Sequence, residues 1–231
     1  MPCSSPGTGA ARSPPYSPRP RSPCRYHIWN TFDDWSPDRR RFAYTAWNLG
    51  ASCDFDPPMA CGRPSVGIWD LDAKGGRAFL KDASLAAWSS DGRKIAAIRL
   101  TRAASDNLRL SLELLIADAA SGQLIGSLAL GSSAFSMPEL YQMAEQDLLH
   151  PTWSPDSTRL LVVDAARNLV LVDSSAWRLR VLARDVVAKG VWASDGKHIA
   201  VQLTGRAPRP REARGPEIYL PPVVYILDAP R

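Results

Sequence analysis

The stretch Pro151-Thr152-Trp153-Ser154-Pro155-Asp156-Ser157 decides the fold, because three further versions of it occur along the chain. They are Asp34-Trp35-Ser36-Pro37-Asp38, Ala87-Trp88-Ser89-Ser90-Asp91-Gly92 and Val191-Trp192-Ala193-Ser194-Asp195-Gly196. In each version an aromatic residue ends an apolar run, a Ser/Ala-x-Asp turn follows, and basic residues lead into new β-forming residues. Ser, Pro, Asp and Gly suit the four successive positions of a type I turn. The chain is therefore predicted to contain one tight β-hairpin four times.

The fourth position of the turn differs among the four versions. Gly92 and Gly196 occupy it in the second and fourth versions, whereas Arg39 and Ser157 replace glycine in the other two. If that position requires a positive φ, each replacement carries a strain of about 1 kcal/mol.

A second marker of repetition lies further along each version. Each third strand is expected to end in an aspartate, namely Asp72, Asp118, Asp173 and Asp228. Together with the hairpins, these residues divide the chain into units near residues 32–80, 85–130, 149–182 and 190–228. Each unit suits a four-stranded antiparallel meander.

A meander of this kind cannot bury both of its faces alone and must stack on its neighbours. Radial stacking makes a β-propeller, so the predicted fold class is all-β, with about four four-stranded antiparallel blades across residues 26–231. The tryptophans that end the innermost strands are expected to pack between blades, where each contributes about 2 to 3 kcal/mol of apolar burial. They are Trp35, Trp88, Trp153 and Trp192.

These residues carry a resemblance to a known family. The pattern aromatic-Ser-Pro-Asp-x-basic, followed by an aliphatic strand and then Leu/Ile-x-Asp before a Gly turn, resembles the WD-repeat-like propeller repeats of TolB-type proteins across residues 28–228. Ile68-Trp69-Asp70 is similar to the third strand of a true WD repeat, but the Gly-His dipeptide of that family is absent. The resemblance implies a bacterial propeller of the TolB type that binds proteins.

The number of blades leaves two alternatives open. The chain holds three complete units and a fourth without its outer strand. Residues 26–30 could supply that strand and close a four-bladed ring. Alternatively the propeller is incomplete and open, which the lack of a further strand after Asp228 favours.

Composition and charge exclude several classes of protein. The 231 residues are 45% hydrophobic and 22% charged, which is ordinary for a globular domain. No run of 18 apolar residues predicts a membrane span. Residues 1–25 are rich in Pro, Ser and Arg without the apolar core of a secretory signal, which indicates a disordered tail or a mis-called start. The net charge of +5 is concentrated in this tail and in residues 206–214, which does not favour nucleic-acid binding.

The sequence offers no complete metal site or catalytic site. The four cysteines are too irregularly spaced for metal binding, although Cys53 and Cys61 share a segment and could form a disulfide in an oxidising compartment, with free cysteines as the alternative. Asp54 and Asp56 match no complete calcium loop. A Gly-x-Ser-x-Gly elbow and a Gly-rich phosphate loop are both absent. We therefore expect no enzyme activity, no metal and no cofactor.

The candidate binding residues lie on one face of the predicted propeller. Loops between second and third strands share a face with the crossovers between blades, and the long, variable segments all belong to these two kinds. Loop variation on a rigid scaffold carries specificity in repeat proteins. The segment 138–149 also has helical character. The candidate partner-binding residues are Asp54, Asp56, Arg102, Asp106, Met137, Tyr141, His150, Arg209 and Arg211.

Two functions follow from this interpretation. The first is a non-enzymatic scaffold that binds a protein or peptide through the variable loops. The alternative, which the resemblance to propeller-bearing peptidases implies, is the substrate-filtering propeller of a prolyl-oligopeptidase-like serine hydrolase whose catalytic domain is not in this chain. The compartment stays open: periplasmic or otherwise extracytoplasmic if an export signal precedes this start, and cytoplasmic if none does.

Overall fold

The computed structural model describes residues 28–48, 63–103, 106–133, 149–184, 188–203 and 223–229, and it is all-β. Within these ranges fifteen strands form four separate sheets and no helix is present. In every sheet the strands follow one another in sequence order, and all neighbours are antiparallel. Each sheet is therefore an up-and-down meander, as the repeats predicted.

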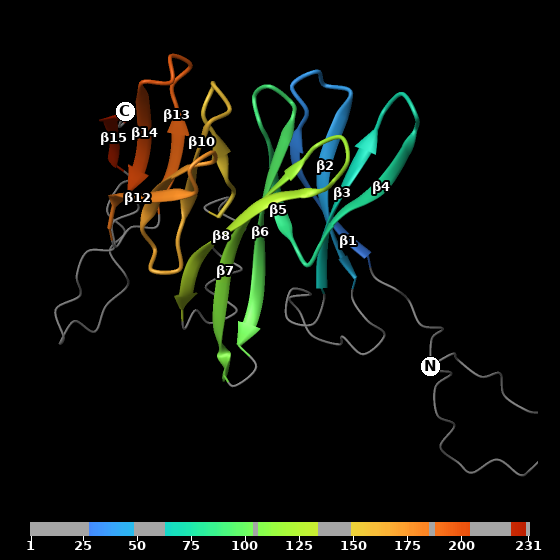
Figure 1. Ribbon diagram of the computed structural model, residues 1–231, viewed down its shortest axis with the longest axis horizontal. Coiled ribbons are helices and arrows are strands. Elements are labelled where there is room, and N and C mark those ends of the chain that lie inside the picture. Colours follow the sequence, from blue (N-terminus) through green and yellow to red (C-terminus); the bar gives the residue numbers. More distant parts are fainter. Residues whose placement is uncertain are drawn as a thin grey trace, which may run out of the picture.

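The four meanders, here called blades 1 to 4, are shown in Figure 1. Blade 1 consists of β1 (Ile28–Trp35), β2 (Arg41–Asn48), β3 (Arg63–Asp70) and β4 (Gly75–Lys81). Blade 2 consists of β5 (Ser84–Trp88), β6 (Lys94–Ala103), β7 (Asp106–Asp118) and β8 (Leu124–Ser133). Blade 3 consists of β9 (Thr152–Trp153), β10 (Arg159–Val163), β11 (Leu169–Asp173) and β12 (Arg178–Ala183). Blade 4 has three strands in the described ranges, β13 (Ala188–Trp192), β14 (His198–Leu203) and β15 (Val223–Asp228).

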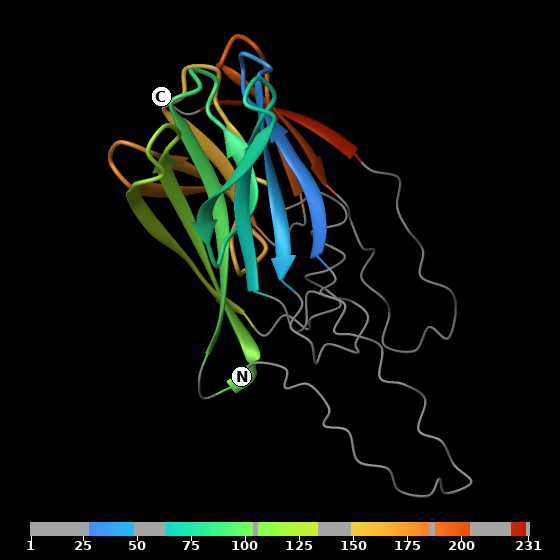
Figure 2. The same cartoon turned by 90° about the vertical axis from the view of Figure 1, so that its right-hand side faces the viewer.

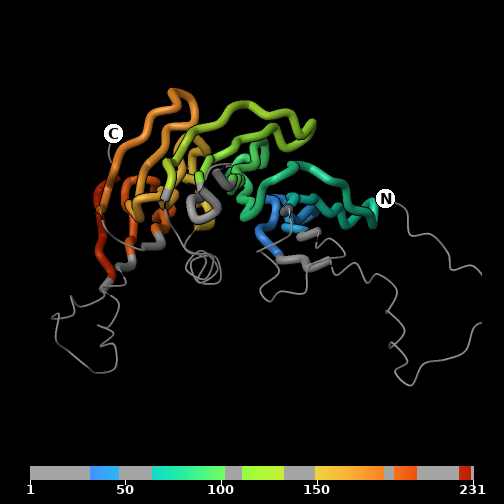
Figure 3. Tube along the Cα trace, turned by 90° about the horizontal axis from the view of Figure 1, so that it is seen from below, coloured from blue at the N-terminus to red at the C-terminus, as the bar shows by residue number. Residues whose placement is uncertain are grey.

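The blades follow one another along an arc whose ends do not meet (Figure 3). The predicted open propeller is therefore confirmed. The alternative of a closed four-bladed ring is wrong, because Ile28, Trp29 and Asn30 do not join blade 4. They form the start of β1 and pair with Asn48, Trp47 and Ala46 of β2.

The four tight turns adopt the predicted geometry. In each turn the amide of the fourth residue donates to the carbonyl of the first, at 2.8 to 3.0 Å. The fourth residue has a positive φ throughout, including 57° at Arg39 and 60° at Ser157. Both replacements of glycine therefore sit in the left-handed region, where a side chain is strained. Figures 1 and 2 show these turns gathered on one side of the arc.

The aspartates at the ends of the third strands require one correction. Asp118, Asp173 and Asp228 end their strands as predicted, but β3 ends at Asp70 and not at Asp72. The Asp70 carboxylate accepts the amides of Asp72 and Ala73, each at 2.9 Å. Asp118 and Asp173 cap the following turn in the same way. The two aspartates are two residues apart, and only the hydrogen bonds identify the one that caps.

The hydrophobic core lies between blades. One cluster joins blades 1 and 2, a second joins blades 2 and 3, and a third joins blades 3 and 4. Trp88, Trp153 and Trp192 are buried in these clusters, which confirms the predicted packing for three of the four tryptophans. The prediction is wrong for Trp35, which is 44% exposed. Its ring lies on the outer face of blade 1, where the described residues supply no preceding blade.

Candidate functional site

On the face that carries the tight turns, here called the turn face, each turn aspartate accepts hydrogen bonds from its own turn. Ser36 Oγ donates to Asp38 at 2.5 Å and the Arg40 amide donates at 3.0 Å, and these bonds hold the pKa of Asp38 below its ordinary value. Burial raises the pKa of Asp156, but hydrogen bonds from Ser154 and Thr158 outweigh that effect and lower it. The turn-face carboxylates therefore serve as local caps.

The opposite face, here called the loop face, receives the long segments. β2 ends and β3 begins there, at Asn48 and Arg63, which pair with each other. The same side carries the end of the β6–β7 hairpin and the pair Leu203 and Val223 of blade 4. Segments 49–62 and 204–222 connect these strand ends in blades 1 and 4, whereas only residues 104–105 separate β6 from β7 and residues 164–168 separate β10 from β11. The predicted long loops between second and third strands are therefore present in blades 1 and 4, and blades 2 and 3 have short connections there.

Few of the predicted partner-binding residues fall in the described ranges. Arg102 and Asp106 lie at the tip of the β6–β7 hairpin, where the backbone of Arg102 pairs with Leu110 and that of Asp106 with Ala103. The other predictions on the long loops lie outside the described residues, as do the cysteines and residues 138–148 of the predicted helix. These site residues are Asp54, Asp56, Met137, Tyr141, Arg209 and Arg211. Their role in binding stays a prediction.

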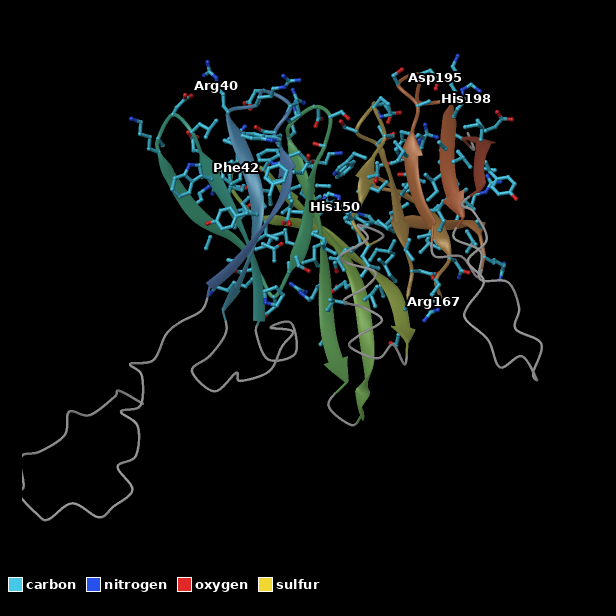
Figure 4. All side chains as sticks on the ribbon, turned by 180° about the vertical axis from the view of Figure 1, so that it is seen from behind. Arg40, Phe42, His150, Arg167, Asp195 and His198 are labelled. Carbon is cyan, nitrogen blue, oxygen red and sulfur yellow. The ribbon has the colours of Figure 1, made fainter. Side chains whose placement is uncertain are left out.

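His150 occupies a different position from the other candidates (Figure 4). Its Nε2 atom lies 3.0 Å from the carbonyl oxygen of Ala86 in β5, and its Nδ1 atom lies 3.1 Å from the carbonyl oxygen of Pro151. The imidazole therefore bridges the innermost strand of blade 2 and the entry to blade 3. This contact gives His150 a part in joining two blades, and its predicted contact with a partner stays a prediction.

A repeated contact between consecutive blades was not foreseen from the sequence. Three residues after each turn aspartate stands a basic residue, and three residues before each aspartate stands the tryptophan. The basic group of one blade lies over the tryptophan ring of the next, at 4.9 Å for Arg41 over Trp88 and 5.3 Å for Lys94 over Trp153. Arg159 lies over Trp192 at 4.9 Å. We call this arrangement the blade joint.

Hydrogen bonds accompany the cation–π contacts at the joints. Trp153 Nε1 donates to the carbonyl of Ala87 at 3.1 Å, and Trp192 Nε1 donates to the carbonyl of Thr152 at 3.2 Å. Lys94 Nζ donates to the carbonyl of Ser157 at 3.0 Å. At the first joint β1 contains a bulge, and Asp33 and Asp34 accept the amides of Ala86 and Trp88. The buried Trp88 Nε1 has no hydrogen-bond partner among the described residues. The spacing Trp-x-x-Asp-x-x-basic, which recurs in every blade, is the sequence signal that could have predicted these contacts.

The two ends of the arc present apolar faces. On the outer face of blade 1 five aromatic rings pack in tilted, edge-to-face and stacked pairs, with centroids 5.4 to 6.4 Å apart. We call this surface the blade 1 end, and its residues are Phe32, Trp35, Phe42, Tyr44 and Trp69. On the outer face of blade 4, here called the blade 4 end, the exposed apolar residues are Val191, Val224 and Ile226.

Within the described ranges, no three His, Cys, Asp or Glu residues gather closely enough to bind a metal ion. In the same part of the chain no helix is long and apolar enough to cross a membrane.

No protein-family model matches the sequence, and no curated protein matches it either. Solved structures do match. The chain is similar to the β-propeller domain of the Trilobed protease from Pyrococcus furiosus, which has an open velcro topology, with a TM-score of 0.57 and 16% identity over 90% of this chain and 56% of that one. It is also similar to TolB from Acinetobacter baumannii, with a TM-score of 0.51 and 16% identity over 88% of this chain and 41% of that one.

The fold is that of a β-propeller. An acylaminoacyl peptidase structure matches as well, with a TM-score of 0.52 and 15% identity over 82% of this chain and 30% of that one. The suspected TolB-type architecture is thus supported at the level of the fold. The chain spans about half the length of the trilobed-protease domain and less of the other two. Propellers of both TolB and peptidases share this fold, so the fold alone does not choose between the two functions.

Proposed function

We propose that this protein is a non-enzymatic propeller module that binds a protein or peptide through its loop face. The observation that carries the proposal is the contrast between the two faces. The turn face is closed by short turns whose carboxylates are engaged by their own backbone amides. The long segments 49–62, 134–148 and 204–222 begin on the loop face, at the ends of paired strands. Specificity in repeat scaffolds resides in such segments.

The test is a selection of peptides that bind the full chain, from a displayed library, followed by affinity measurement with two loop-face variants. One replaces residues 134–148 by a short Gly/Ser linker, and the other combines Arg209→Glu with Arg211→Glu. A loss of about tenfold or more in affinity with either variant is expected if the loops contact the peptide.

The matched control carries two charge changes on the turn face, Lys74→Glu and Arg93→Glu. Both side chains are exposed, so this variant should fold and bind the selected peptides as the wild type does. Peptides that bind both loop-face variants with unchanged affinity, but bind the turn-face variant weakly, would contradict the proposal.

The second candidate is the substrate-filtering propeller of a prolyl-oligopeptidase-like hydrolase. It draws support from the similarity to the acylaminoacyl peptidase structure, of which this chain covers 30%. Under this function the loop face would meet a catalytic domain. A hydrolase with a Gly-x-Ser-x-Gly elbow, encoded beside this chain and binding it, should then cleave short peptides in preference to long ones only when the propeller is present. Peptide hydrolysis by this chain alone would contradict both functions.

A further inference from the structure

The two ends of the arc are the two halves of one further blade joint. Every blade has a face toward the blade before it and a face toward the blade after it, because side chains alternate along each strand. Positions counted from the turn aspartate therefore have the same surroundings in each blade. Only the first blade lacks a preceding neighbour and only the fourth lacks a following one in the described ranges.

Equivalent positions are buried at the internal joints and exposed at the blade 4 end. Ile226 pairs with Ala200 in blade 4, as Ile68 pairs with Ala43 in blade 1 and Ile116 with Ala96 in blade 2. Ile68 and Ile116 are buried, whereas Ile226 is 65% exposed. Val224 is 62% exposed, although its equivalents Val66, Leu114 and Leu169 are all buried. The blade 4 end therefore carries apolar residues at positions that the following blade covers elsewhere, but no following blade covers them among the described residues.

The blade 1 end shows the complementary pattern. Phe42 stands four residues after Asp38, and its equivalents Ile95, Leu160 and Ile199 are fully buried against the preceding blade. Phe42 itself is only partly buried, and Phe32 beside it is 57% exposed. Trp35 is the equivalent of the three tryptophans that receive a cation from the preceding blade. Figure 4 labels Phe42 in blade 1 and His198 in blade 4, far apart along the arc.

The polar groups of a joint are also present at the two ends: the blade 4 end carries the basic residue and the acceptor carbonyl, and the blade 1 end carries the tryptophan. His198 stands three residues after Asp195, where Arg41, Lys94 and Arg159 stand in the other blades. Its Nδ1 atom lies 2.6 Å from Asp195 Oδ2, a contact within its own turn. Val191 precedes Trp192, as Ala87 precedes Trp88 and Thr152 precedes Trp153. Its carbonyl is thus the equivalent of the two carbonyls that accept an indole N–H.

We propose that the blade 4 end of one chain docks on the blade 1 end of a second copy, and that two copies close into a ring of eight blades. In each joint His198 lies over Trp35 of the partner copy, whose indole nitrogen donates to the carbonyl of Val191. A second copy is the occupant because this chain carries both halves of the contact that its own blades already use. Two arcs of four blades make eight, within the range of four to eight that propellers use. A two-fold axis through the centre of the ring, perpendicular to its plane, makes the two contacts identical and leaves no end open.

The test begins with the molar mass of the full chain by light scattering and sedimentation. At about 100 μM, where a Kd of about 1 μM leaves most chains paired, twice the chain mass of 25.2 kDa is expected. Phe32→Lys and Ile226→Lys should each raise the dimer Kd by about tenfold or more, because each places a charge in both joints. Ile125→Lys is the matched control: Ile125 is 51% exposed, but on β8 at the outer rim, and the dimer should persist.

Mixing the two variants separates a head-to-tail ring from other dimers. A pair made of one Phe32→Lys chain and one Ile226→Lys chain retains one undamaged joint, so the mixture should associate more tightly than either variant alone. His198→Lys copies the residue of blade 2 and should keep the dimer, whereas His198→Ala should weaken it. Since all these positions are exposed, circular dichroism should show folded variants.

Several outcomes would overturn the proposal. One is a wild-type chain that stays monomeric at about 100 μM. Another is a dimer that Ile226→Lys leaves unchanged, which would place two blade 1 ends against each other. A mass that keeps rising with concentration would also overturn it, since a head-to-tail contact that does not close forms filaments.

Discussion

Lys94 of blade 2 and Trp153 of blade 3 are 59 residues apart in the chain, yet the Lys94 ammonium lies 5.3 Å from the centroid of the tryptophan ring. The same ammonium donates to the carbonyl of Ser157 at 3.0 Å. The Lys94 side chain therefore contacts both the tryptophan ring and the tight turn of the following blade. Because Arg41 and Arg159 contact Trp88 and Trp192 in the same way, this relationship defines how consecutive blades are fastened.

Lys94→Met should destabilise the protein by about 1 to 2 kcal/mol. The methionine retains most of the aliphatic stem but removes the cation over the ring and the hydrogen bond to Ser157. The free energy of unfolding in urea measures the loss. Lys74→Met on an exposed turn is the control, with an expected change within about 0.5 kcal/mol. Equal effects of the two substitutions would show that the cation–π contact does not stabilise the joint.

Trp153→Phe should cost about 1 kcal/mol more than Trp88→Phe. Both substitutions shrink a buried ring in an interblade cluster, but only Trp153 donates its indole N–H to a carbonyl, that of Ala87. The Trp88 nitrogen is buried without a partner in the part of the chain that the structure describes, so its removal loses no hydrogen bond seen there. Urea denaturation of the two variants, with equal slopes, is the measurement. A larger cost at Trp88 would show that ring volume dominates.

Arg39→Gly should stabilise the protein by up to about 1 kcal/mol, since Arg39 has a φ of 57° and glycine adopts this conformation without strain. Ser157→Gly relieves a similar φ but should bring no gain. The Ser157 hydroxyl accepts the amide of Asp91 at 2.9 Å, and its removal leaves that amide without its partner. Thermal unfolding of the two variants compares them, and a gain at both positions would mean that the Asp91 contact contributes nothing.

Stability should fall as the pH drops below about 4. The turn carboxylates, among them Asp38, Asp91 and Asp156, have pKa values below the ordinary 3.8 in the folded state. A depressed folded pKa gives stability that is complete above the unfolded pKa and is lost as the pH falls through the folded pKa.

Asp156→Asn is the variant that checks this pH dependence. It should be less stable than the wild type by about 1 kcal/mol at neutral pH, because the amide accepts the hydrogen bonds of Ser154 and Thr158 more weakly than a carboxylate does. Urea titrations between neutral pH and about pH 2 follow the difference, which should shrink toward zero with acid. A constant difference would show that the charge of Asp156 has no part in it.

Local chemistry explains how much of the fold was predictable. The turn type and the positive φ at Arg39 and Ser157 depend on residues within a single turn, so the sequence of that turn suffices to predict them. The meanders pair strands further apart, such as Asn48 with Arg63, and were predicted from the repetition of the pattern. Asp70 and Asp72 mark the limit of that information, because both can cap a turn and only the register of β3 against β2 selects Asp70.

The contacts of the candidate site were harder to predict from the sequence, because they join residues that are far apart in the chain. His150 reads as an isolated histidine beside a variable segment, but its Nε2 atom meets Ala86, 64 residues earlier. From the sequence, the basic residue of the spacing Trp-x-x-Asp-x-x-basic is expected to be solvated. In the structure it lies over the tryptophan ring of the next blade. No pattern within one repeat contains the partner of a contact made between repeats.

By itself the sequence determined that the chain repeats one hairpin four times and that each meander must be covered on both faces, because alternation and turn geometry are local properties. Only the tertiary structure decided where that cover is supplied and where it is missing. Trp88, Trp153 and Trp192 are buried and Trp35 is exposed, although the four sit in the same motif. Burial is decided by the neighbouring blade, and blade 1 has a neighbour on one side alone within the described residues.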